Sequence, residues 1–228
     1  MPFAAVCQKM IDAWVGLQPG DHGTPQDIYA DVADKLTTRM RLSLVDVSDD
    51  DPEQWELKTI RHSRLPARIL DLNVMFRGGR LADFPDKAYL QHAVIPKYLH
   101  VMEKRQPLID SVETRLAGVR VVYDRIILPQ KGVTRPDWLV VCTFGRFMAR
   151  LPNHKLEVNA ADEAVLMRLM EGLSAKEIAL EVGLSPRTVE HRLERLKKQL
   201  GARSLPHLAA MLVALGFDGS ISYRDEID

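Results

Sequence analysis

Apolar residues recur at helical intervals near the start of the chain and over its last third, and form strand-like runs between these two regions. From Phe3 to Leu17 they fall every three or four positions, which predicts an amphipathic helix. The apolar residues do not form one block, and neither a basic start nor a small-residue cleavage site accompanies them. We therefore interpret the segment as a folded helix and not as a signal peptide.

The middle of the chain alternates between strand-like and helical patterns. Runs rich in β-branched and aromatic residues predict strands at Leu42–Val47, Trp55–His62, Leu108–Arg115, Val119–Leu128 and Trp138–Phe147. Between the second and third runs, Arg64–Phe76 predicts a short helix. Asp86–Arg105 predicts a longer one, which Pro96 bends or splits. The resulting order is two strands, a helical middle and three strands.

That order resembles a PAS-type sensor domain over roughly residues 25–148. The local signals are Leu42–Val47, Gly79–Phe84, Gln106-Pro107 and Tyr123–Pro129. The resemblance implies a five-stranded antiparallel sheet, with central helices that cover one face and enclose a small pocket. The sequence does not identify the pocket residues, since Met75, Tyr98 and Met102 either line it or belong to the core.

The last third of the chain has helical spacing only, with clear start and stop signals. Four helices are predicted, at Ala161–Glu171, Ser174–Gly183, Ser185–Leu200 and Ser204–Gly216. Ser174 and Glu177 have the spacing of a capping box, in which each side chain satisfies a backbone N–H. Ser185 and Pro186 supply an N-cap serine and a proline at the first helical position.

The third of these helices has the pattern of a DNA-binding helix. Val189, Leu193, Leu196 and Leu200 form a narrow apolar stripe, and the other positions are polar. Basic residues outnumber acidic ones there although the whole chain has a formal net charge of +0. The basic residues are Arg187, Arg192, Arg195, Lys197 and Lys198. Two short helices joined by a glycine turn, the second with a basic outer face, indicate a helix-turn-helix.

The same segments resemble the LuxR-type family of transcription regulators, at Gly172–Ala179, Gly183–His191 and Leu200–Ser204. The resemblance implies contacts to phosphates from Lys176, Ser185, Thr188 and His191, and positions at or near base edges for Arg187, Val189 and Glu190. Arg192, Arg195 and Lys198 complete the predicted DNA-binding set. An acid at Glu190 departs from residues common in the family. It would accept from cytosine N4 and repel phosphate, so the preferred half-site stays open.

We therefore interpret the chain as a cytoplasmic one-component regulator of α+β class, with a PAS-like domain that senses a small ligand or another cue. The resemblance implies homodimers that pair through the last helix, around Pro206–Leu215, on palindromic duplex DNA. RNA polymerase is a further partner that we consider. The predicted parts are an N-terminal helix at 1–24, the PAS-like domain at 25–149, a linker at 150–157, the four-helix LuxR-type domain at 158–217 and an acidic tail at 218–228.

Two alternatives keep part of this interpretation. One is a quorum-sensing regulator with an acyl-homoserine-lactone domain, although Asp51-Pro52 lacks the aromatic residues that precede this pair in such domains. The other is a protein-interaction adaptor whose basic helix binds an acidic partner. An enzyme is not expected, because no paired carboxylates, nucleophile elbow or phosphate loop is found.

Cysteine and histidine usage adds little chemistry. Cys7 and Cys142 lie far apart and offer no metal-ligand spacing, so we expect reduced thiols and no metal. No stretch approaches the ~20 apolar residues that a membrane span requires. We expect no cofactor, with haem bound by His62, His92 or His100 as the alternative.

Overall fold

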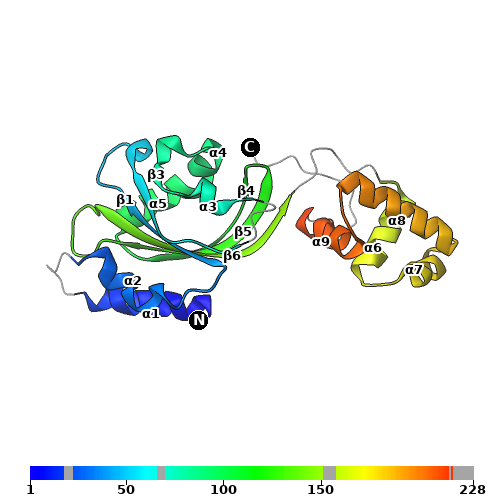
Figure 1. Ribbon diagram of the computed structural model, residues 1–228, viewed down its shortest axis with the longest axis horizontal. Coiled ribbons are helices and arrows are strands. Elements are labelled where there is room, and N and C mark those ends of the chain that lie inside the picture. Colours follow the sequence, from blue (N-terminus) through cyan, green and yellow to red (C-terminus); the bar gives the residue numbers. More distant parts are fainter. Residues whose placement is uncertain (18–22, 66–69, 151–157, 216, 218–228) are drawn as a thin grey trace. The chain divides into compact units, whose positions relative to one another are not determined.

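The computed structural model describes residues 1–17, 23–65, 70–150, 158–215 and 217 (Figure 1). The chain forms two compact units, Met1–Met148 and Ala149–Asp228. Arg150 ends the last strand, and the other residues of the predicted linker at 150–157 lie outside the described residues, as does the predicted acidic tail at 218–228. The N-terminal helix belongs to the same compact unit as the sheet.

The first unit is built on a sheet with the strand order β3-β2-β1-β6-β5-β4. The strands are β1 (Met40–Asp46), β2 (Glu56–Arg61), β3 (Gly79–Arg80), β4 (Leu108–Leu116), β5 (Val119–Pro129) and β6 (Trp138–Arg150). β1 pairs antiparallel with β2 and β6, and β4 pairs antiparallel with β5. The five predicted strands are present. The added strand, β3, forms because Gly78 at φ 115° and Gly79 at φ 111° turn the chain back onto Leu57.

The sheet separates two hydrophobic cores, because successive side chains of a strand point to opposite faces. Met40 and Leu42 of β1 pack against α1 (Phe3–Gly16) and α2 (Pro25–Ala33). Figure 1 shows these two helices on one face of the sheet and the central helices on the other. Val45 belongs to the core on the second face, with Trp55, Tyr98 and Ile127.

Helix α2 was not predicted from the sequence, although its start signal is clear in retrospect. Thr24 and Asp27 form a capping box, in which the Thr24 backbone N–H donates to Asp27 Oδ2 at 2.7 Å, and Pro25 occupies the first turn. Ile28, Tyr29 and Val32 of this helix are buried in the core beside α1. Both N-terminal helices therefore contribute to the hydrophobic core of the first unit.

The central helices differ in part from the prediction. The prediction of a helix over Arg64–Phe76 is wrong for most of the residues that the structure describes in this segment. Residues 66–69 lie outside the description, and α3 (Leu72–Met75) begins only where Asp71 accepts hydrogen bonds from Asn73 N and Val74 N. The predicted Asp86–Arg105 helix forms a continuous helical run. It comprises α4 (Lys87–Tyr89), a π-helical turn (Leu90–Val94) and α5 (Ile95–Lys104). Pro96, which has no N–H, lies in the first turn of α5, so the helix changes its hydrogen-bond register there without breaking.

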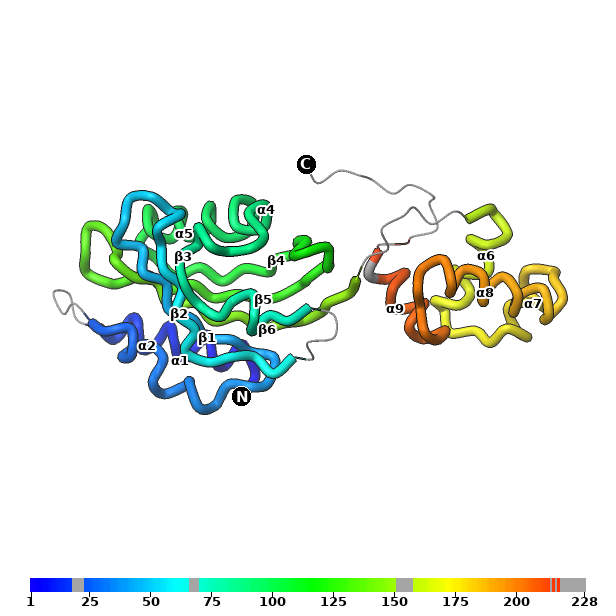
Figure 2. Tube along the Cα trace, turned by 45° about the horizontal axis from the view of Figure 1, so that its top comes forward, coloured from blue at the N-terminus to red at the C-terminus, as the bar shows by residue number. Residues whose placement is uncertain are grey.

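The second unit consists of the four predicted helices, α6 (Ala160–Met170), α7 (Ala175–Val182), α8 (Pro186–Leu200) and α9 (Leu205–Leu215) (Figure 2). They share one core, which fully buries Leu166, Ile178, Leu196, Leu208 and Leu212. Among the described residues, no helix of either unit has the length and apolar character needed to cross a membrane.

Candidate nucleic-acid interface

The first helix of the helix-turn-helix, α7, is fixed at both ends by local chemistry. The Ser174 backbone N–H donates to Glu177 Oε2 at 2.8 Å, and the Glu177 N–H donates to Ser174 Oγ at 3.4 Å. Hydrogen bonds to its carboxylate from the Ser174 side chain and from the Ser174 backbone N–H lower the pKa of Glu177 below its usual value. Gly183 ends the helix in the left-handed conformation at φ 70°, which glycine adopts without strain. The turn into the next helix is therefore tightly specified.

The start of α8 presents two hydroxyl groups. Ser185 Oγ accepts the Thr188 backbone N–H at 3.1 Å and lies 2.8 Å from Thr188 Oγ1. Because one hydrogen bond between the hydroxyls uses only one of their two protons, the other proton is available to an outside acceptor. The free N–H groups and the helix dipole also favour an anion at this end. The first turn of α8 therefore suits a phosphate oxygen.

The apolar stripe of α8 is buried in the domain core. Val189, Leu193, Leu196 and Leu200 are at most 4% exposed. This burial corrects one assignment, because Val189 was expected at or near base edges and is 0% exposed. Its side chain anchors α8 to the other helices and cannot contact a base.

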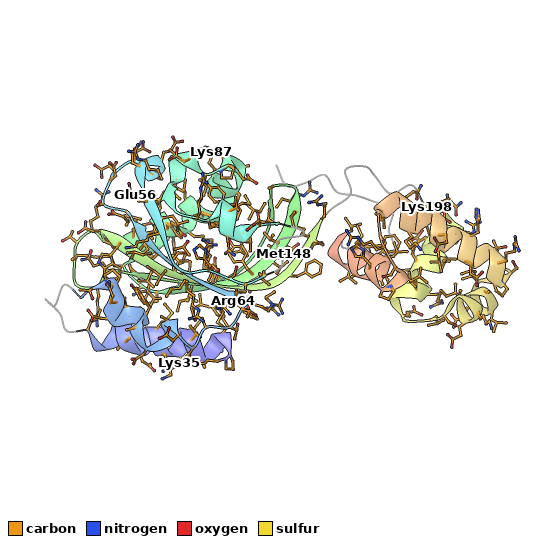
Figure 3. The ribbon with its side chains drawn as sticks, in the orientation of Figure 1. Lys35, Glu56, Arg64, Lys87, Met148 and Lys198 are labelled. Atoms are coloured by element: carbon orange, nitrogen blue, oxygen red, sulfur yellow. The ribbon has the colours of Figure 1, made fainter. Side chains whose placement is uncertain are left out.

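The opposite face of α8 and the start of α7 are open to solvent. The exposed members of the predicted set are Lys176, Ser185, Arg187, Glu190, His191, Arg195 and Lys198, and Thr188 is half-buried. Lys198 lies on the outer side of α8 (Figure 3). Within the part of the chain that the structure describes, Lys176, Arg187 and Lys198 form no ion pair, whereas Lys197 Nζ is 2.5 Å from Glu194 Oε1. Lys176, Arg187 and Lys198 are thus free to bind an external anion.

Arg192 and Arg195 have an internal partner that the sequence interpretation missed. Arg192 Nη1 lies 2.7 Å from Asp162 Oδ1, and Arg195 Nη2 contacts Asp162 Oδ2. The Asp162 side chain is 1% exposed. Burial by itself raises the pKa of Asp162, but hydrogen bonds from Arg195, Arg192 and the Asn159 backbone outweigh it and lower the pKa. The spacing of Asn159 and Asp162, a capping box at the start of α6, was the available signal.

The first unit contains a cavity of about 90 Å³ between the sheet and the central helices. Tyr98 lines it, whereas Met75 and Met102 pack at the edge of the surrounding core. On one wall Arg125, which is 2% exposed, makes a bidentate ion pair with Asp110, from Nε at 3.0 Å and from Nη2 at 2.8 Å. The sequence interpretation had not singled out this buried pair.

The histidines considered as haem ligands lie outside this cavity. His62, His92 and His100 are exposed, and none of them lines the cavity wall. His92 Nδ1 is engaged at 2.7 Å with the backbone oxygen of Ala88. None of the three is therefore placed to hold a haem between the sheet and the central helices. Among the described residues, no group of three or more His, Cys, Asp or Glu could hold a metal ion.

Comparison with known proteins supports the C-terminal assignment. The family model of sigma-70, region 4, matches residues 161–200. The transcriptional regulatory protein FixJ of Rhizobium meliloti (strain 1021) is 41% identical over 59 residues, which make up 26% of this chain and 29% of FixJ. The match thus spans less than a third of FixJ. The predicted resemblance to helix-turn-helix regulators of the LuxR type is confirmed for the second unit.

Solved structures give weaker similarities. The Vibrio cholerae VqmA dimer, described as a LuxR-type receptor, is 20% identical, with a TM-score of 0.28, over 54% of this chain and 61% of VqmA. A Rhodobacter sphaeroides LOV protein is 13% identical, with a TM-score of 0.34, over 84% of this chain and 97% of that one. The PAS-like fold of the first unit is established by its own antiparallel sheet, by the central helices on one face and by the cavity between them. The α+β fold class is confirmed.

Proposed function

We propose that this protein is a one-component transcription regulator that binds duplex DNA through the first turn and outer face of α8. One observation carries the proposal. Helix α8 buries its leucine stripe completely while Arg187, beside the capped first turn, stays exposed and forms no ion pair within the described residues. A helix held in this way fits the major groove, which is ~12 Å wide.

The exposed residues divide into two roles in this proposal. Lys176, Ser185, Thr188 and His191 bind phosphates and set the position of the domain on the duplex. Arg187 and Glu190 lie at base edges, where Arg187 donates to guanine and Glu190 accepts from cytosine N4. Lys198 contacts a flanking phosphate. Arg192 and Arg195 stabilise α8 through Asp162, and Arg195, with 42% of its side chain exposed, also faces the backbone of the DNA.

We propose a homodimer that pairs through α9. What supports this is an exposed stripe at helical spacing, formed by Pro206, Ala210 and Val213, on a helix whose other face is in the core. Val213 is 62% exposed. A twofold dimer of this kind requires a palindromic site with half-sites about one helical turn apart, or a multiple of it.

We further propose that the first unit is a sensor that acts in the cytoplasm and changes DNA binding or contact with RNA polymerase. The cavity between the sheet and the central helices supports a small ligand as the cue. The Asp51-Pro52 pair does not indicate a lactone site. The Asp51 side chain accepts the Glu53 N–H at 3.0 Å and caps the exposed turn Pro52–Gln54.

The proposal is tested by selection of bound sequences from a random duplex library with the purified full chain at low salt. We expect enrichment of a palindrome, and affinity for it that falls steeply as salt rises. An adaptor whose basic helix binds an acidic protein would enrich no sequence. That outcome, with Arg187→Ala indistinguishable from the unaltered protein, would contradict the proposal.

A further inference from the structure

Among the residues that the structure describes, two that line the cavity of the first unit each carry a buried polar atom without a hydrogen-bond partner. The two atoms are Arg41 Nε and Ser63 Oγ, on lining residues that are 6% and 3% exposed. Buried polar atoms in native proteins nearly always have a hydrogen-bond partner, and an exception calls for an explanation. Two exceptions on residues of one cavity wall leave hydrogen-bonding capacity that a bound ligand would use.

The chain brings these two atoms to the same region of the sheet. Arg41 belongs to β1, and Ser63 follows β2, the antiparallel neighbour of β1. The next residue, Arg64, donates its backbone N–H to Thr38 O at 2.7 Å, which holds the segment beside the start of β1. Figure 3 labels Arg64 at this part of the sheet. Arg41 and Ser63 therefore lie on neighbouring segments that both line the cavity.

Arg41 carries a buried charge that no described residue balances. Its guanidinium donates to Leu72 O at 3.1 Å, to Thr59 Oγ1 at 2.6 Å and to Phe76 O, and within the described residues it has no carboxylate partner. Burial lowers the pKa of Arg41 to about 10. Arg125, on the wall of the same cavity, is instead neutralised by Asp110. A buried cation without a counter-ion is unfavourable, so an anion in the cavity would stabilise the protein.

The rest of the cavity fixes the size and shape of the ligand. The cavity is small, with a volume of about 90 Å³. Phe76, Phe84 and Tyr89 form an aromatic wall, with ring centroids 4.9 to 6.1 Å apart. Such a wall favours a flat ring or a compact branched chain.

We propose that the cavity binds a small monocarboxylate with an apolar aromatic or branched body, and that its carboxylate accepts hydrogen bonds from Arg41 Nε and Ser63 Oγ. This names the ligand class of the sensor unit, and its regulatory meaning rests on the function proposed above. The Arg125–Asp110 pair is already complete and does not take part in recognition of the anion.

The test is isothermal titration calorimetry of the full chain without DNA, with benzoate, isovalerate and the neutral isostere benzamide as probes. Benzoate should bind at least tenfold more tightly than benzamide, because only the carboxylate offsets the charge of Arg41. Isovalerate should bind as well. No binding of either carboxylate, or equal affinity for benzoate and benzamide, would overturn the proposal. Because the titration contains no DNA, a chain that binds no carboxylate would overturn the ligand proposal and leave the DNA-binding proposal untouched. A chain that binds benzoate but no duplex would overturn only the DNA-binding proposal.

Substitutions of Ser63 and Arg41 test where the carboxylate of the ligand binds. Ser63→Ala should weaken benzoate about tenfold, because one hydrogen bond to a charged group is lost. Arg41→Gln should weaken it further and remove the preference over benzamide. If Arg41→Gln does not fold, the benzoate affinity of Ser63→Ala decides the test by itself. Arg120→Gln on β5, which removes the ion-pair partner of Glu113 on β4, is the control and should leave affinity unchanged. Unchanged benzoate affinity in Ser63→Ala and in any folded Arg41 variant would overturn the assignment.

Discussion

Asp162 Oδ1 accepts a hydrogen bond from Arg192 Nη1 at 2.7 Å, which ties the first turn of α6 to the middle of α8. Asp162→Asn should destabilise the second unit by about 2 kcal/mol, since it leaves two guanidinium groups without their carboxylate while both remain partly open to water. Hydrogen exchange measured by mass spectrometry should show this as reduced protection of peptides from α6 and α8. Glu171→Gln, in a half-exposed pair with Arg168, is the control and should change protection little.

The same carboxylate predicts a pH dependence. Its pKa is lowered in the folded chain, so its contribution is fully present above the unfolded-state value of about 3.9 and is lost as pH falls through the folded-state value. Protection of α8 should therefore decrease on acidification below about pH 4. The decrease should be smaller in Asp162→Asn. Equal acid sensitivity of both proteins would show that Asp162 does not stabilise α8.

Substitution of Arg187 and substitution of Lys176 should affect DNA binding in different ways. Arg187→Ala should cost about 1–3 kcal/mol on the selected duplex and relax the preference at one base pair. Lys176→Ala should weaken all duplexes alike and reduce the slope of log affinity against log salt by about 1. Fluorescence anisotropy with selected and scrambled duplexes separates the two effects. Identical losses on both duplexes for both variants would contradict the division of roles.

Val213, exposed on α9, should control the oligomeric state. Val213→Glu places a charge in the proposed dimer surface and should yield a monomer by light scattering, with affinity for the palindrome reduced more than tenfold. Leu180→Glu changes an apolar side chain on α7 that is 84% exposed and should leave the dimer intact. A dimer that survives Val213→Glu would place the interface elsewhere.

Removal of one partner of the Arg125–Asp110 pair should destabilise the protein strongly, whereas replacement of both by apolar residues should destabilise it little. Asp110→Asn leaves a buried guanidinium without its counter-ion and should reduce the free energy of unfolding by about 3–5 kcal/mol. Combining Arg125→Met with Asp110→Leu should restore much of the loss, because neither charge then remains in the core. Urea unfolding followed by tryptophan fluorescence reports on this unit, since Trp14, Trp55 and Trp138 all lie in it.

The second unit was largely predictable because its signals are local. Ser174, Ser185, Gly183 and Gly201 begin and end the helices by chemistry that acts within a few residues. The stripe spacing likewise determines which face of α8 is buried. Val189 was assigned to both the stripe and the base edges, and packing allows only the first.

Long-range pairings were not predictable from the pattern. Arg41 and Arg125 occupy inward positions of β1 and β5, where a strand pattern predicts apolar residues, and their partners lie in distant segments. The partnership of Asp162 with Arg192 likewise spans 30 positions. Helix α2 is a different case, because its Thr24–Asp27 capping box was local and could have been found.

The central claim is that the first turn of α8 enters the groove of the duplex. Site-specific photo-crosslinking tests it most directly, with a benzophenone amino acid at position 187 in the full chain and, as a control, at the exposed position 8 of α1. We expect crosslinks to the selected duplex from position 187, competed away by the unlabelled duplex, and none from position 8. Crosslinking from position 8 without any from position 187, on a duplex that the protein binds, would contradict the proposed interface.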